Sequence, residues 1–243
     1  KKATILIPTF SEYEDACRVF GHAVFFLNNN VDFSAIQLPA CSVFWLGNPN
    51  NPDGKLRNAE EIKTLCEKHP DSFFVIDEAY GDLCHGFVSM IPFVEKIKNL
   101  IVVKSLTKTF AIPGLRLGYV LSSAQLIQKL LQIKMPWTVN ALAIEAGHFI
   151  VQHYADFLPD TVSLLQESLA FQQQLAAIAG VEVQASVCNF FLAKLQHHTA
   201  LELKQKLMLQ HGLLIRDAAN FKGLSPQHFR VSIQKKEYNS LFI

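Results

Sequence analysis

The chain has 243 residues, half of them hydrophobic, and its 22 basic and 21 acidic side chains nearly cancel. This length allows one large domain or two smaller ones. The balanced charge gives no field that would attract nucleic acid or an anionic membrane surface, so small molecules are the expected partners.

Two features of the sequence predict a cytoplasmic location. No apolar run reaches the length of about eighteen residues that a membrane span needs. The cysteines lie far apart and form no metal-ligand pattern, so we expect no metal site and mostly buried, reduced thiols. The five cysteines are Cys17, Cys41, Cys66, Cys84 and Cys188.

The first two thirds of the chain alternate β-branched runs with amphipathic stretches, which is typical of a parallel sheet with crossover helices. Several runs are apolar on both faces, as in strands buried between two layers of helices. Helices are expected over residues 13–20, with Gly21 as the C-cap, and from the N-cap Asn58 to Lys68. The expected strands are residues 4–7, 23–27, 43–46, 73–76, 100–103 and 118–121.

The pattern changes at about Asp156. A long amphipathic stretch reaches residue 179, and it precedes short strands at 181–183, 190–193, 213–216 and 229–233, with a helix at 201–211. We therefore expect an α/β fold with a large domain over residues 1–155, built on a mostly parallel sheet, and a smaller α+β domain over residues 156–243. The chain begins on a strand and ends in a helix without a stop signal, which predicts that the N-terminal part is missing and the end truncated.

Three polar segments follow strands of the expected parallel sheet. They read Asn-Pro-Asn-Asn-Pro-Asp-Gly at 48–54, Asp-Glu-Ala-Tyr at 77–80 and Ser-Leu-Thr-Lys at 105–108. Taken singly, each has an ordinary explanation as a turn, a helix cap or a surface charge. Ligands of open α/β sheets bind at the carboxyl ends of the strands, however, so we expect the three segments to converge on one crevice.

The order of these segments, followed by Pro-Gly-Leu-Arg-Leu-Gly at 113–118, resembles the fold-type I aminotransferases of class I/II. That family shares Asn-Pro-x-Gly, Asp-x-x-Tyr, Ser-x-x-Lys and a downstream Arg-x-Gly, and the resemblance covers essentially the whole chain. It implies an aminotransferase-like fold, an enzyme dependent on pyridoxal 5'-phosphate, and a homodimer. The family's glycine-rich loop and its tyrosine that crosses the dimer interface have no counterpart here, so the phosphate site is expected to be incomplete.

The resemblance implies a role for each matching residue. Lys108 would bind the cofactor covalently through its amine, and Asp77 would pair with the pyridine nitrogen so that the ring accepts electrons from the substrate. A buried Lys108 amine beside Arg116 would lose proton affinity. The other cofactor contacts would be Asn51 and Tyr80 on the phenolic oxygen, Ser105 and Arg116 on the phosphate, and Phe10 on the ring face.

Phe10 has an alternative explanation, and two further arginines are candidates for binding the substrate. Phe10 is as readily a core residue, because the chain contains 19 phenylalanines. Arg230, in Phe-Arg-Val-Ser at 229–232, lies where the family binds the substrate carboxylate. Arg216 would be a second anion site, or else a solvated side chain or one paired with Asp217.

Two stretches favour a particular reaction. Residues 215–226 with 229–231, and residues 135–141, resemble threonine-phosphate decarboxylases of cobalamin biosynthesis more closely than histidinol-phosphate aminotransferases. The resemblance implies decarboxylation of a small phosphorylated amino acid, L-threonine O-3-phosphate, to an aminopropanol phosphate. Amino transfer from histidinol phosphate is the alternative. A non-catalytic sensor domain is a third reading, although the sequence has no helix-turn-helix pattern or basic patch for DNA binding.

Overall fold

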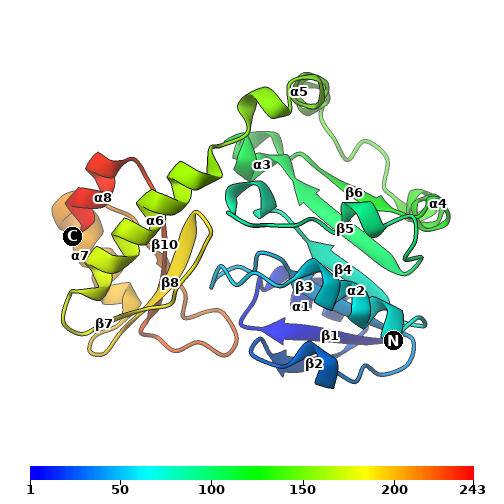
Figure 1. Ribbon diagram of the computed structural model, residues 1–243, viewed down its shortest axis with the longest axis horizontal. Coiled ribbons are helices and arrows are strands. Elements are labelled where there is room, and N and C mark those ends of the chain that lie inside the picture. The colour runs from blue at the N-terminus through cyan, green and yellow to red at the C-terminus, as the bar shows by residue number, and fades with distance from the viewer.

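The computed structural model covers residues 1–243 and contains two β-sheets, with α6 (Thr161–Ala176) leading from one to the other (Figure 1). The larger sheet has six strands in the order β2-β1-β3-β4-β5-β6. All neighbouring strands are parallel except β5 and β6, so the predicted mostly parallel sheet is confirmed. The strands are β1 (Lys2–Ile7), β2 (Ala23–Asn28), β3 (Ser42–Gly47), β4 (Phe73–Asp77), β5 (Leu100–Ser105) and β6 (Gly118–Ser122).

Helices cover both faces of this sheet, which explains why its central strands are apolar on both sides. Phe44 and Phe74 belong to a buried cluster with Ile62 of α2 (Ala59–Lys68). On the other face, Ile5 of β1 packs in a separate cluster with Tyr13 of α1 (Glu12–Val19). Both helices were predicted, and the expected N-cap of α2 is confirmed because the Asn58 side chain accepts a hydrogen bond from the Glu60 amide at 2.8 Å.

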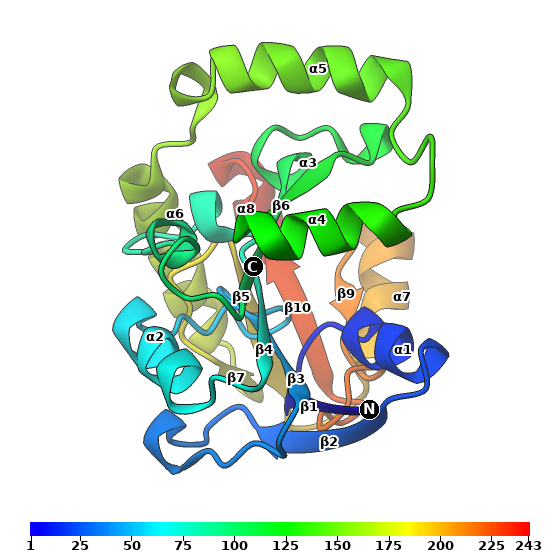
Figure 2. The same cartoon turned by 90° about the vertical axis from the view of Figure 1, so that its right-hand side faces the viewer.

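Three helices follow the last two strands of the sheet. They are α3 (Leu106–Thr109) after β5, and α4 (Ala124–Ile133) and α5 (Ala141–Gln152) after β6. Figure 2 shows α5 at the periphery of the molecule, joined to α4 by an extended segment. Large apolar side chains of this region are exposed, and Trp137 is 95% accessible. None of the helices combines the length and the apolar character that a membrane span requires. Short 3-10 helices occupy the connections at Phe33–Ala35, Gly81–Leu83, Ile91–Phe93, Pro113–Leu115 and Ala155–Phe157.

The second sheet has four antiparallel strands in the order β7-β8-β10-β9. Phe171 of α6 packs against Phe191 and Phe229 in its buried cluster. The expected strand at residues 213–216 is wrong for residues 213–215, and only Arg216 belongs to a strand. The apolar pattern was misleading because Ile215 is buried by packing and not by strand pairing. The elements are β7 (Val181–Val183), β8 (Phe190–Leu195), α7 (Ala200–His211), β9 (Arg216–Asp217), β10 (His228–Ser232) and α8 (Lys236–Phe242). The domain boundary at residue 156 stays a prediction.

Gly54 is the point at which the turn after β3 touches the segment before β8. Its φ of +69° is in the left-handed region, and a Cβ atom there would lie 2.1 Å from Oγ of Ser186. The Ser186 hydroxyl donates to the Phe190 carbonyl at 2.6 Å, so it is not free to move away. Gly21 has a similar φ of +71°, but a Cβ there would meet no atom within 4 Å.

These two glycines make a matched pair for a stability measurement. Gly21→Ala is expected to lower the free energy of unfolding by about 1 kcal/mol, from the left-handed backbone alone. Gly54→Ala adds a steric clash and is expected to lower it by on the order of 3 kcal/mol. Urea denaturation followed by circular dichroism measures both. Equal losses for the two variants would contradict the close approach at Gly54.

Candidate active site

A cavity of about 100 Å³ lies at the carboxyl ends of the central parallel strands. Its lining includes Asn51 from the turn after β3, Asp77 from the end of β4 and Lys108 from α3, which follows β5. The three polar segments of the sequence therefore meet at one edge of the sheet, as parallel strands require. The complete lining is Phe10, Tyr13, Pro49, Asn51, Asp77, Ala79, Tyr80 and Lys108.

The Asp77 carboxylate is held by one hydrogen bond on each oxygen. Oδ1 accepts from the Ala79 amide at 2.9 Å, and Oδ2 accepts from the Tyr13 hydroxyl at 2.7 Å. Burial raises the pKa of Asp77, while these two hydrogen bonds and the charge of Lys108 oppose the rise. Because a carboxylate can accept about four hydrogen bonds, acceptor capacity remains for a ligand in the cavity.

The Lys108 amine has a lowered pKa. The largest cause is partial burial, followed by the positive charge of Arg116, and a smaller contribution comes from Arg230, while Asp77 acts in the opposite direction. The side chain is more exposed than the sequence led us to expect, because α3 carries it to the mouth of the cavity and not into the core. A lowered pKa increases the fraction of neutral, nucleophilic amine at a given pH.

Hydroxyl groups link Lys108 to the end of β5. Its Nζ donates to Thr107 Oγ1 at 3.0 Å, and Thr107 Oγ1 lies 2.7 Å from Ser105 Oγ. Arg116 is exposed and donates to the Pro113 carbonyl at 3.0 Å. Ser105 and Arg116 do not line the cavity itself, but Ser105 is linked to Lys108 through Thr107, and the charge of Arg116 acts on Lys108. Their hydroxyl and guanidinium groups are suitable donors for an anion.

Arg230 connects the second sheet with this cavity. Its Nη1 donates to Asn51 Oδ1 at 2.5 Å, and its buried Nε has no partner. Arg216 lies directly opposite Arg230 in the β9–β10 register and donates to Asn220 Oδ1 at 3.0 Å, whereas no ion pair with Asp217 forms. Opposed residues share one face of a sheet, so both arginine side chains project from the same face. Two cations on one face can bind anionic groups.

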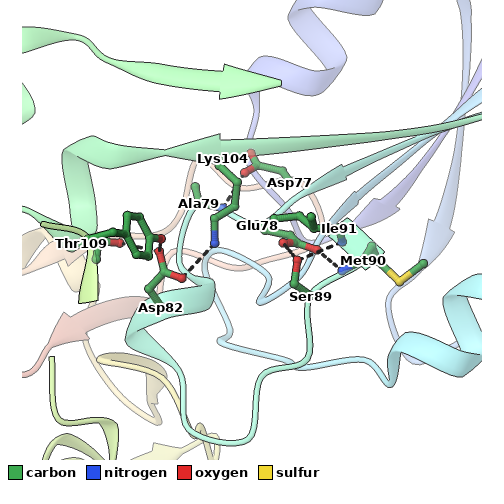
Figure 3. A network of polar contacts seen from close by, with 10 residues as sticks. Asp77, Glu78, Ala79, Asp82, Ser89, Met90, Ile91, Lys104 and Thr109 are labelled. Atoms are coloured by element: carbon green, nitrogen blue, oxygen red, sulfur yellow. Dashed lines mark hydrogen bonds and ion pairs between the residues drawn. The ribbon is translucent and has the colours of Figure 1, made fainter. Parts of the chain in front are cut away.

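A polar network holds the segments on either side of Lys108 (Figure 3). Asp82 accepts hydrogen bonds from Lys104 Nζ at 3.0 Å, from Thr109 Oγ1 at 3.1 Å and from the Tyr154 hydroxyl at 2.7 Å. Lys104 is 4% exposed, so Asp82 provides an ion-pair partner for a buried side chain. The network joins β5, α3 and the connection after α5, which limits how far Lys108 can shift.

Sequence reasoning missed several of these residues. Tyr13 follows Phe10 by three positions, a spacing that brings side chains together on a helical turn, and their ring centroids are 5.7 Å apart. That spacing was a usable signal, as was the position of Thr107 between Ser105 and Lys108. No local sequence pattern predicts the pairing of Asp82 with Lys104, because the two residues are 22 positions apart and come together only in the folded chain.

The chemistry of the cavity suits one kind of cofactor. The amine of Lys108 can attack a carbonyl group, and the carboxylate of Asp77 can pair with a protonated ring nitrogen. The donors near Arg116 and Ser105 can bind an anionic group. A heteroaromatic aldehyde that also carries a phosphate would use all three.

Comparisons with known proteins agree with this fold. The family Aminotransferase class I and II matches residues 1–241. The crystal structure of L-threonine-O-3-phosphate decarboxylase from Porphyromonas gingivalis is similar, with a TM-score of 0.95 and 39% identity, over 99% of this chain and 74% of that chain. A relative from Caldanaerobacter subterraneus, provisionally named threonine-phosphate decarboxylase, is 36% identical over 100% of this chain and 69% of its own length. A histidinol-phosphate aminotransferase from the same organism is 28% identical over 97% and 67%.

The lowered pKa of Lys108 generates a prediction for the cofactor-free protein. Arg116→Met is expected to raise this pKa, because removing a nearby positive charge favours the protonated amine. Labelling of Lys108 by acetic anhydride at mildly alkaline pH should therefore slow severalfold, as measured by peptide mass spectrometry. Lys63, whose pKa is raised by Glu60 and Glu67, should label more slowly than Lys108 in the wild type and be unaffected by the substitution. An unchanged Lys108 rate would contradict the coupling to Arg116.

Proposed function

Since the chain belongs to the class I and II aminotransferase family, we propose that it is a pyridoxal-phosphate-dependent enzyme that decarboxylates L-threonine O-3-phosphate. The observation that carries the proposal is the pair of opposed arginines, Arg216 and Arg230, of which Arg230 contacts Asn51 at the cavity. A substrate with both a carboxylate and a phosphate needs two such cations. The similarity to proteins named for threonine phosphate supports the same substrate class.

In this proposal the cavity binds pyridoxal 5'-phosphate, which supplies an electron sink for the charge that develops at the substrate α-carbon. Lys108 provides the amine for covalent attachment, and Asp77 pairs with the pyridine nitrogen. The acceptor capacity left on Asp77 and the lowered pKa of Lys108 support both roles. The remaining contacts are Asn51 and Tyr80 to the phenolic oxygen, Phe10 to the ring face, and Ser105 and Arg116 to the phosphate.

The residues of this chain then carry out binding and proton transfer. Arg216 and Arg230 hold the two anionic groups of the substrate and so orient the bond between the α-carbon and the carboxylate. When that bond breaks, carbon dioxide leaves and the electron pair of the bond remains on the α-carbon. The amine of Lys108, freed when the substrate amine takes its place, delivers the proton that replaces carbon dioxide.

Histidinol-phosphate aminotransferase activity is the second candidate, and a specific observation favours it: a relative with that name is 28% identical over 97% of this chain. The same arginines would bind the phosphate of that substrate. The difference is that Lys108 would remove a proton from the α-carbon, and that an oxoacid would be needed to accept the amino group.

Product analysis separates the two candidates. With pyridoxal phosphate and L-threonine O-3-phosphate, we expect release of carbon dioxide and an aminopropanol phosphate without any 2-oxoacid. Lys108→Ala should lower the rate by at least about a thousandfold, because the covalent attachment point and the proton donor are lost together. Lys63→Ala, at a partly exposed lysine of α2 outside the cavity, serves as the matched control and should retain activity.

Other outcomes of these assays would indicate a different function. Conversion of histidinol phosphate that depends on a 2-oxoacid or glutamate would favour the aminotransferase. A change in the absorbance of pyridoxal phosphate without turnover of either substrate would favour a sensor domain. A cytoplasmic location stays a prediction.

We also propose that the protein is a homodimer whose interface includes α4, α5 and the segment between them. Several large apolar side chains of these elements are more than half exposed, and exposed apolar surface of this kind marks interaction sites. They include Leu131, Ile133, Met135, Trp137, Leu142 and Phe149. Burying them against a second copy would remove this apolar surface from water.

Sedimentation velocity tests the dimer. The intact protein is expected to sediment as a dimer, and Trp137→Asp combined with Leu142→Asp should shift it to a monomer, because charges are costly in an apolar interface. Leu209→Asp in α7 changes an equally exposed leucine elsewhere, at 81% exposure, and should leave the dimer intact. A monomeric wild-type protein at micromolar concentration would contradict the proposal.

A further inference from the structure

Tyr13 is a buried residue of the cavity to which the proposed function gives no role. Its hydroxyl donates to Asp77 Oδ2 at 2.7 Å, and the residue is 7% exposed. The ring stacks on Trp45 with centroids 5.0 Å apart and an interplanar angle of 20°, and it meets Phe10 edge-on at 5.7 Å. Because aromatic contacts fix the ring on two sides, the hydroxyl is preorganised toward Asp77.

We propose that Tyr13 is a positioning residue for the cofactor: its hydroxyl holds the Asp77 carboxylate in the charged form and in the orientation that pairs with a protonated pyridine nitrogen. The inference rests on the proposed function, since it requires that pyridoxal phosphate binds in this cavity. It assigns to Tyr13 an effect that is transmitted through Asp77 and not through direct contact with the reacting atoms.

The electrostatic argument concerns which groups keep Asp77 ionised. Burial raises the pKa of Asp77, and a neutral carboxyl group would be a poor partner for a pyridinium. Tyr13, the Ala79 amide and the charge on Lys108 oppose this rise. Of these three contributions, the charge on Lys108 is the one that changes, because in the proposed function the same amine becomes covalently attached to the cofactor. The hydroxyl of Tyr13 is then the side-chain donor that remains.

Tyr13 is itself suited to act as a permanent donor. Burial and the neighbouring Asp77 carboxylate raise the pKa of its phenol well above the usual value, so the hydroxyl keeps its proton. The hydrogen bond is therefore directed from Tyr13 to Asp77 throughout the neutral range. Together with the Ala79 amide on Oδ1, it fixes both carboxylate oxygens.

The geometry also couples two cofactor contacts. Phe10, proposed to cover the ring face, packs against the same phenol that holds Asp77. A tyrosine at this position therefore sets the orientation of the carboxylate and the aromatic wall together. A structural role in the core alone would predict that the ring of Tyr13 matters and its hydroxyl does not.

Three single variants test this distinction, with pyridoxal phosphate ¹⁵N-labelled in its ring as the probe. Tyr13→Phe keeps the ring and removes the hydroxyl, Tyr13→Leu removes both, and Tyr119→Phe removes a hydroxyl on β6 outside the cavity. We expect Tyr13→Phe to raise the cofactor dissociation constant by about tenfold, as for a lost hydrogen bond to a charged group. The ¹⁵N resonance should move toward that of neutral pyridine. Tyr119→Phe should change neither quantity.

A double-mutant cycle shows whether the effect passes through Asp77. In an Asp77→Asn background, removing the Tyr13 hydroxyl should no longer change the dissociation constant or the ¹⁵N resonance, because no carboxylate remains to be ionised. Thermal melting of each variant confirms that it is folded at the temperature of measurement.

The outcomes separate this inference from the proposed function. A folded Tyr13→Phe protein with wild-type affinity and an unshifted ¹⁵N resonance would overturn the inference, as would a loss seen only with Tyr13→Leu. Failure of the wild-type protein to bind pyridoxal phosphate would instead overturn the proposed function. If Tyr13→Phe shifts the ¹⁵N resonance in the wild-type background but not in the Asp77→Asn background, the result supports both the inference and the proposed function.

Discussion

The Asp77 carboxyl group is buried in a place that disfavours charge, and the residues around it supply the hydrogen bonds and the positive charge that oppose this effect. Asp77 is the last residue of β4, paired in register with Gly47 of β3 and Val103 of β5. The turn that carries Asn51 and the helix that carries Lys108 therefore begin beside it. The parallel register thus brings a carboxylate, an amide and an amine together without any long flexible connection.

Burial moves the pKa of Asp77 upward and that of Lys108 downward, so each group is driven toward its neutral form. Their mutual attraction opposes both shifts but is incomplete. In the proposed function, a cofactor with a protonated ring nitrogen and an aldehyde would relieve both at once, because it offers Asp77 a cation and uses Lys108 as a nucleophile. Tyr13 would hold the carboxylate ready before the cofactor arrives.

Local sequence patterns predicted the six strands of the large sheet, the helices α1 and α2 and the strand ends at which polar segments meet, because periodicity and capping are local properties. They did not predict that Ile215 would be buried without strand pairing, or that Lys108 would lie at the mouth of the cavity. Both depend on how distant segments pack. The hydrogen bond from Tyr13 to Asp77 joins residues 64 positions apart, and no sequence window contains it.

If the proposed function is correct, Asp77 and Lys108 do not determine the choice between decarboxylation and amino transfer, because both reactions would use them alike. In the proposed function it would depend on which bond of the α-carbon stands perpendicular to the ring, and the residues that bind the substrate anions would set that angle. Arg216 and Arg230 come from the second sheet, so the position of this sheet relative to the first would determine the angle. The contacts that join the two parts include the hydrogen bond of Arg230 with Asn51 and the ion pair of Lys222 with Glu14 at 3.1 Å. They also include a buried cluster in which Cys84 packs with Cys188 and Phe190. Under the proposed function, reaction specificity is therefore a property of the contact between the two sheets.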